Sequence, residues 1–212
     1  MYRIFIALLF INFCYSQSYY VYVAAESDDT VSVLKFDGDN FEETDKVTVG
    51  IMPTENEGPH GITIDPSGKY WYLTLAHGSP NGSLVKYSTE NNEPLSKVEL
   101  GLFPATMQIS PKTGLLYAAN FNLHGLMRTS TVSVVDPENM VEITKIKTGI
   151  MPHGSRISID GTTHYSVAMM SGELFEIDAL DLSVKRILSL DNNSNYRTVS
   201  YTHLTLPTTS PV

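Results

Sequence analysis

The phrase GIMP stands at Gly50–Pro53, returns as GLFP at Gly101–Pro104, and appears again as GIMP at Gly149–Pro152. Self-similarity at intervals of about 50 residues is typical of repeat architectures such as propellers. The first interval is lengthened by an insertion, TENEGP, between Pro53 and His60. Each copy of the phrase therefore marks the start of a repeated unit.

Every unit contains four short segments in which apolar residues alternate with polar ones, separated by turns rich in Gly, Asp, Asn and Pro. The clearest unit begins at Gly61 and reads GITI, KYWYLTLA, SLVKYS and LSKVEL. No long stretch has the periodicity of an amphipathic helix. We therefore predict an all-β fold, a β-propeller of four-stranded antiparallel blades, with about four blades in this chain. A β-sandwich is the alternative, but it gives no reason for one loop phrase to recur at the same place in each unit.

The first block supplies only three strand-like segments, YYVYVAA, TVSVLKF and EETDKVTVG, which correspond to the second, third and fourth strands of a unit. We expect its innermost strand to come from the far end of the protein, because propellers commonly close their ring in this way. The stretch from Val199 to Thr209, VSYTHLTLPTT, reads as the translation of a sequencing adapter, so residues 199–212 are interpreted as a non-native tail. The alternative is a genuine strand that closes a four-bladed ring.

The first 16 residues have the pattern of a secretory signal peptide, with Arg3 before an apolar run that extends from Ile4 to Phe13. That run is about half of the roughly 20 residues that a membrane-spanning helix needs. We therefore predict a signal peptide at 1–16, a partial propeller at 17–198, and a secreted or periplasmic location. Cleavage at this point removes Cys14, the only cysteine, so neither a disulfide nor thiol chemistry is expected.

The formal net charge is -9, and no basic run is present that could follow a phosphate backbone. This composition argues against nucleic acid as a partner. We expect a protein or a small-molecule ligand at the propeller rim, and no membrane span once the signal peptide is removed.

Three segments, GPHGITIDPSGKYWYL, STVSVVDPENMVEITKIKTG and MPHGSRISIDGTTHYSV, resemble the YVTN-type β-propeller repeat family. The resemblance extends from Tyr19 to about Leu190. It implies a ring of seven blades, of which some would lie outside this chain. Its relatives include the propellers of nitrous oxide reductase and cytochrome d1-type nitrite reductase, lactonases of the phosphogluconolactonase type, and surface-layer proteins, so it does not by itself select a function.

Four histidines precede a glycine and fall at two places in the units. Two of them start innermost strands and two follow second strands, and both places lie at the same face of a propeller. Two methionines at the end of a second strand join them there. The candidate metal ligands are thus His60, His77, His124, His153, Met169 and Met170.

Imidazole and thioether groups form a ligand set that suits copper better than magnesium or calcium. The resemblance to nitrous oxide reductase, whose propeller binds copper through histidines, implies the same metal. The alternative is that PHG is a turn phrase in which the histidine only bonds a neighbouring loop. Ala105 stands where the other two units have histidine, so the ring of ligands is interrupted in this chain.

Arg156 follows the second PHG phrase on an innermost strand, where its guanidinium could hold an anionic ligand in the channel. A buried ion pair with an acid of a neighbouring blade is the alternative. Four aspartates stand at strand ends before turn residues, where an acid usually caps a turn: Asp65, Asp136, Asp160 and Asp178.

The chain lacks a G-x-S-x-G elbow, a phosphate loop, an H-E-x-x-H pair and a haem-attachment motif. The first hypothesis is therefore an exported binding or scaffold propeller, with enzymatic activity left undecided. The second is a copper-binding or redox-associated propeller related to nitrous oxide reductase. The third is a lactonase-like hydrolase, in which rim side chains polarise a ring ester and activate water.

Overall fold

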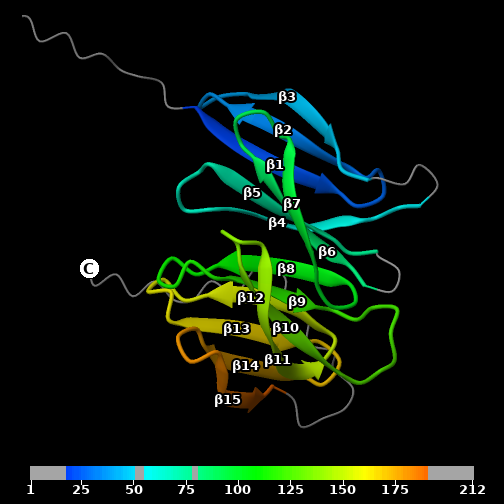
Figure 1. Cartoon of the computed structure of the whole chain (residues 1–212), viewed down its shortest axis with the longest axis vertical. Helices are drawn as coiled ribbons and strands as arrows, with labels where there is room; N and C mark the ends of the chain where they lie inside the picture. Colours follow the sequence, from blue (N-terminus) through cyan, green and yellow to red (C-terminus); the bar gives the residue numbers. More distant parts are fainter. Residues whose placement is uncertain (1–17, 51–54, 78–80, 191–212) are drawn as a thin grey trace, which may run out of the picture.

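The structure is a computed structural model that describes residues 18–50, 55–77 and 81–190. These residues form fifteen strands in four antiparallel sheets, which follow one another in chain order from blue to orange in Figure 1. The predicted signal peptide at 1–16 and the predicted tail at 199–212 lie outside the described residues. No helix long and apolar enough to cross a bilayer is found in the described part of the chain.

Each sheet is a meander in which consecutive strands pair. The first has three strands, β1 (Tyr19–Ala25), β2 (Thr30–Phe36) and β3 (Phe41–Thr48). The second has four, β4 (Pro59–Ile64), β5 (Tyr70–Leu75), β6 (Ser83–Ser88) and β7 (Pro94–Glu99). The third has β8 (Pro104–Ile109), β9 (Leu116–Asn120), β10 (Thr129–Asp136) and β11 (Val141–Ile150). The fourth has β12 (Pro152–Ile157), β13 (Thr163–Ala168), β14 (Glu173–Asp178) and β15 (Ser183–Ser189).

The sheets are arranged as the blades of a propeller. The innermost strands of the complete blades, β4, β8 and β12, lie beside one another in that order, and β1 lies against β4. The first sheet has three strands, as the sequence predicted. The all-β class and a partial propeller of about four blades are therefore confirmed.

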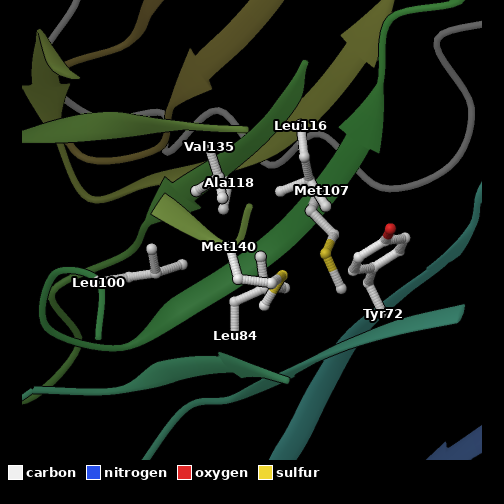
Figure 2. Close-up of a cluster of buried hydrophobic side chains, with 8 residues drawn as sticks. All are labelled: Tyr72, Leu84, Leu100, Met107, Leu116, Ala118, Val135 and Met140. Carbon is white, nitrogen blue, oxygen red and sulfur yellow. The ribbon is translucent and has the colours of Figure 1, made fainter. Parts of the chain in front are cut away.

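Burial follows the position of a strand within its blade. The middle strands β5 and β9 are buried along nearly their whole length, because neighbouring blades cover both of their faces, while β3, β7 and β15 at the outer edge are mostly exposed. Figure 2 shows the core between the second and third blades, where Tyr72 and Leu84 meet Met107 and Met140. Burial of each such side chain stabilises the fold by about 1.5–3 kcal/mol.

The repeated phrase has a common backbone conformation. The residue before the proline that opens each innermost strand has a positive φ: 62° at Gly58, 53° at Phe103 and 56° at Met151. In the second blade the insertion supplies this proline, Pro59, and Gly58 is the residue before it. The second blade therefore makes the same turn as the other two, but six residues later in the phrase. The residue that follows each proline therefore occupies the same position in its blade, the second residue of the innermost strand.

Two innermost strands approach each other closely at Gly61. A Cβ atom built on Gly61 would lie 2.0 Å from the carbonyl oxygen of Ala105. The Thr74 hydroxyl lies in the same gap, 3.1 Å from that oxygen and 2.7 Å from the backbone nitrogen of Gly61. Gly61, the glycine of the first PHG phrase, is therefore required by packing between blades.

The four aspartates at strand ends cap turns, as predicted. Asp178 accepts backbone N–H groups from Leu180 and Asp181, and the other three make the same kind of contact with residues two to five positions further on. A hydrogen bond from Lys185, followed by these backbone bonds, lowers the pKa of Asp178 to about 2. These acids serve the fold.

Candidate functional site

Histidines from two blades gather around one aromatic ring at the end of the blades where the innermost strands begin. The ring centroid of Phe103 lies 5.4 Å from that of His60, 5.0 Å from that of His77 and 5.7 Å from that of His124. Phe103 is the left-handed residue of its loop phrase, which turns its ring into this position. The sequence placed these histidines on one rim, and the structure brings them together.

A carboxylate that the sequence analysis did not single out joins two of these histidines. Glu26 lies 3.1 Å from His60 through Oε2 and Nδ1, and 3.1 Å from His77 through Oε1 and Nε2. One carboxylate therefore accepts a ring N–H from each of two imidazoles. This fixes which nitrogen of each ring carries the proton.

The fourth histidine meets the first across the intervening blade. The Nε2 atoms of His60 and His153 are 3.4 Å apart, and the two rings are nearly perpendicular. His153 also packs edge-on against Phe121, and its backbone carbonyl accepts the Thr106 hydroxyl. We call Glu26, His60, His77 and His153 the rim cluster; His124 lies beside it, with its ring 5.5 Å from that of His77.

Burial and charge give the members of the rim cluster different protonation behaviour. Partial burial works to raise the pKa of the Glu26 carboxyl, but hydrogen bonds from His77 and His60 outweigh it, so this pKa is lowered. Burial, together with the nearby His60, lowers the pKa of His153. The cluster therefore holds an ionised carboxylate and, in His153, an imidazole that stays neutral at pH 7.

The rim cluster is partly accessible to solvent. The side chains of His60, His77 and Glu26 are 23%, 31% and 41% exposed. Hydrogen-bonding groups that are held in place and still accessible are what general acid–base catalysis and ligand binding require.

The other predicted site residues lie elsewhere. Met169 and Met170 are half-buried and pack against the apolar cluster that contains Phe103 and Phe121. The half-buried Arg156 directs Nη1 to the carbonyl oxygen of Ser155, 3.0 Å away. Neither the two methionines nor Arg156 has a contact that joins it to the rim cluster among those found in the described residues.

Within the described ranges, no group of three or more His, Cys, Asp and Glu side chains is placed to hold a metal ion together. Copper binding by the six predicted ligands therefore stays a prediction.

Glu26 could have been found by the rule that selected His77 and His124. Those histidines follow the second strands of their blades, and Glu26 immediately follows β1, which is the second strand of the first blade. An acid at this position is as good a candidate for the rim as a histidine or a methionine. The pattern of the incomplete first block therefore indicates this carboxylate as well.

A histidine–hydroxyl pair lies inside the fold, apart from the rim cluster. Nε2 of His164 is 2.6 Å from Oγ of Ser155, and its ring stacks on Tyr117 with the centroids 4.9 Å apart. His164 is fully buried, and burial lowers its pKa to about 3. A Ser–His pair of this kind resembles a nucleophile and its base, but no substrate can reach it, so it is a structural contact.

Comparison with known proteins places the fold. The family described as "Lactonase, 7-bladed beta-propeller" matches residues 11–148, which is more than half of the chain. A comparison with curated protein sequences finds no match.

Among solved structures, hydrazine synthase of Kuenenia stuttgartiensis is similar with a TM-score of 0.65 and 21% identity, over 85% of this chain and 51% of that one. A protein described as a 6-phosphogluconolactonase of Bacteroides uniformis gives 0.64 and 20%, over 81% and 52%. A chain of a nidogen–laminin complex gives 0.58 and 16%, over 79% and 58%. This chain thus spans about half the length of these structures, and likeness at such identities shows the propeller fold alone.

Proposed function

Because the chain belongs to the lactonase family of seven-bladed β-propellers, we propose that it hydrolyses a cyclic ester at the rim cluster. The observation that carries this proposal is the hydrogen bond between Glu26 and Nδ1 of His60, which leaves Nε2 of an accessible imidazole as an acceptor. A carboxylate behind a histidine orients the ring and stabilises the imidazolium that forms during proton transfer.

In this mechanism His60 is the general base. Its Nε2 accepts a proton from a water molecule as the water oxygen attacks the ester carbonyl carbon of the ring. The ring C–O bond then breaks, and the imidazolium returns the proton to the leaving alkoxide, which gives a hydroxy acid. Atoms and charge balance without any further reactant.

His153 supplies the second function that the reaction needs. Its lowered pKa keeps the ring neutral, and its Nε2 lies 3.4 Å from the base. In the free protein the Nε2–H of His153 donates to Nε2 of His60. When a lactone and a water molecule enter, the Nε2–H of His153 donates to the carbonyl oxygen, where negative charge develops.

The test is hydrolysis of a panel of five- and six-membered lactones, with and without a phosphate substituent, followed as acid release. We expect His60→Ala to lower kcat/KM by about 10²- to 10⁴-fold, the usual contribution of a general base. Glu26→Gln keeps an oxygen for the Nδ1–H of His60 and is expected to lower kcat roughly 10- to 100-fold with little change in KM. The matched control is Glu90→Gln, which changes an exposed carboxylate in the turn between β6 and β7.

Absence of hydrolysis across the panel by the unmodified protein would overturn the proposal. Activity that persists in His60→Ala would show that the base lies elsewhere.

The second candidate is the exported binding or scaffold module. It is supported by the burial of the Ser155–His164 pair. This pair has the form of a nucleophile and its base, but a ligand cannot contact it. A lactone that binds in a His60-dependent way and is recovered chemically unchanged supports this function over hydrolysis. The secreted or periplasmic location stays a prediction.

A further inference from the structure

Two imidazole nitrogens from different blades face each other in the rim cluster. His60 belongs to β4 and His153 to β12, and β8 lies between these strands. Their Nε2 atoms are nevertheless only 3.4 Å apart. Ordering two side chains from separate blades at one point is entropically unfavourable, so the contact calls for a compensating interaction.

The separation of the two atoms has the dimension of a metal site. Two imidazole nitrogens bound at about 2.0–2.1 Å to one tetrahedral ion lie roughly 3.3–3.4 Å apart. The contact between His60 and His153 has that value. At this separation a tetrahedral ion lies off the line that joins the two atoms, about 2.0–2.1 Å from each.

Glu26 provides an independent indication. A histidine that ligates a metal almost always donates its other ring N–H to a carboxylate, a carbonyl or water. Nδ1 of His60 lies 3.1 Å from Oε2 of Glu26, which leaves Nε2 to present its lone pair toward His153. The carboxylate is in turn fixed by His77, 3.1 Å from its second oxygen.

We propose that Nε2 of His60 and Nε2 of His153 together bind one divalent ion of the class that prefers imidazole, such as Cu²⁺ or Zn²⁺, with Glu26 as the positioning residue behind His60. Because no group of three or more candidate ligands is found in the described residues, water or a bound anion completes the coordination. Affinity follows the general order for nitrogen ligands, Cu²⁺ above Zn²⁺, and Mg²⁺ does not bind.

The ion and the substrate compete for the same two nitrogens, because an ion bound to Nε2 of His153 requires the proton of that ring to be on Nδ1. Under the proposed function, which this consequence rests on, Nε2 of His60 accepts a proton from water. When the same lone pair is bound to a metal it cannot do so, and loading therefore suppresses lactone hydrolysis until a chelator removes the ion.

The experiment is titration of the purified, metal-stripped full chain with Cu²⁺ and separately with Zn²⁺, followed by calorimetry and, for Cu²⁺, by electron paramagnetic resonance. We expect one ion per chain, and a Cu²⁺ spectrum with superhyperfine splitting from two ligand nitrogens. His60→Ala and His153→Ala should each weaken binding at least 10-fold. Glu26→Gln should weaken it by up to about 10-fold while retaining the two-nitrogen spectrum, since it changes only the group behind a ligand.

The matched control is His124→Ala, which removes an exposed imidazole beside the cluster and should leave the affinity unchanged. Circular dichroism of each variant shows that the fold is retained. Binding that is equal in unmodified protein and in the His60→Ala, His153→Ala double variant overturns the proposal, and the contact is then an ordinary hydrogen bond between rings. Because the titration uses the metal alone, its result tests the metal site independently of lactone hydrolysis.

Discussion

Two histidine clusters of this propeller use similar hydrogen bonds in opposite surroundings. His164 lies fully buried between the third and fourth blades, bonded to Ser155 and stacked on Tyr117. His60 lies at the rim with part of its side chain exposed, bonded to Glu26 and facing His153. The first arrangement has the outward form of a catalytic pair but is inaccessible, whereas the second has the less familiar form and is open to ligands.

Accessibility to solvent, more than the hydrogen bonds themselves, distinguishes the two clusters. Burial removes the charged form of His164 and commits its ring to packing. At the rim, partial exposure leaves an imidazole and a carboxylate accessible to a ligand. We therefore expect changes at the buried pair to affect stability, and changes at the rim to affect activity and binding.

His164→Ala is expected to lower the stability of the fold more than any other change considered. Loss of the stacked ring, together with the orphaned Ser155 hydroxyl, should lower the free energy of unfolding by about 3 kcal/mol. Urea denaturation followed by circular dichroism measures this loss. A loss below about 1 kcal/mol would show that the ring contributes little and would break the contrast between the two clusters.

The next largest change in the free energy of unfolding is expected when the pH is lowered. His164 has a pKa of about 3 in the folded protein, against about 6.5 in an unfolded chain, so below pH 6.5 the unfolded chain binds a proton that the folded one does not. The free energy of unfolding should therefore fall as pH decreases from about 6.5 toward 4.5, by up to about 1.4 kcal/mol per pH unit.

The measurement is urea denaturation at several pH values in that window, for the unmodified protein and for His164→Gln. The lowered pKa of His153 acts in the same direction, so the contribution of His164 is the difference between the two slopes. Identical slopes would contradict the assignment.

The smallest expected effect on stability is that of His77→Ala at the rim. Its ion pair with Glu26 is partly exposed, and pairs of this kind contribute about 0–1 kcal/mol. The free energy of unfolding should change by less than about 1 kcal/mol, measured as for His164→Ala. A change as large as that of His164→Ala would mean that the rim cluster is part of the structural core.

The repeat in the sequence was sufficient to predict the blades, because strand alternation and turn residues are local properties. The three-stranded first block followed from counting segments, and the turn-capping aspartates from their position at strand ends. The expectation of a seven-bladed ring rested on the family resemblance, and the family that matches the chain is also described as seven-bladed. The more specific YVTN assignment is not confirmed by that match.

The site was predictable only in part, because it depends on contacts between blades. That His60, His77, His124 and His153 share a rim could be read from their positions in the units. That His60 meets His153 across a whole blade could not, since the curvature of the ring sets this distance. Met169 and Met170 were placed on the right element but pack into the apolar cluster, because a thioether is also a good filler of irregular space.

The left-handed residue before each innermost strand has a consequence for how such a protein can change over evolution. Proline and the turn before it hold the start of the strand, and the next residue is histidine at His60 and His153 but a fully buried alanine at Ala105. Two blades thus present an imidazole from the same backbone position, whereas the blade between them presents a buried methyl group. The ligand set of the rim can therefore change by substitution at the two histidine positions, with the scaffold left unchanged.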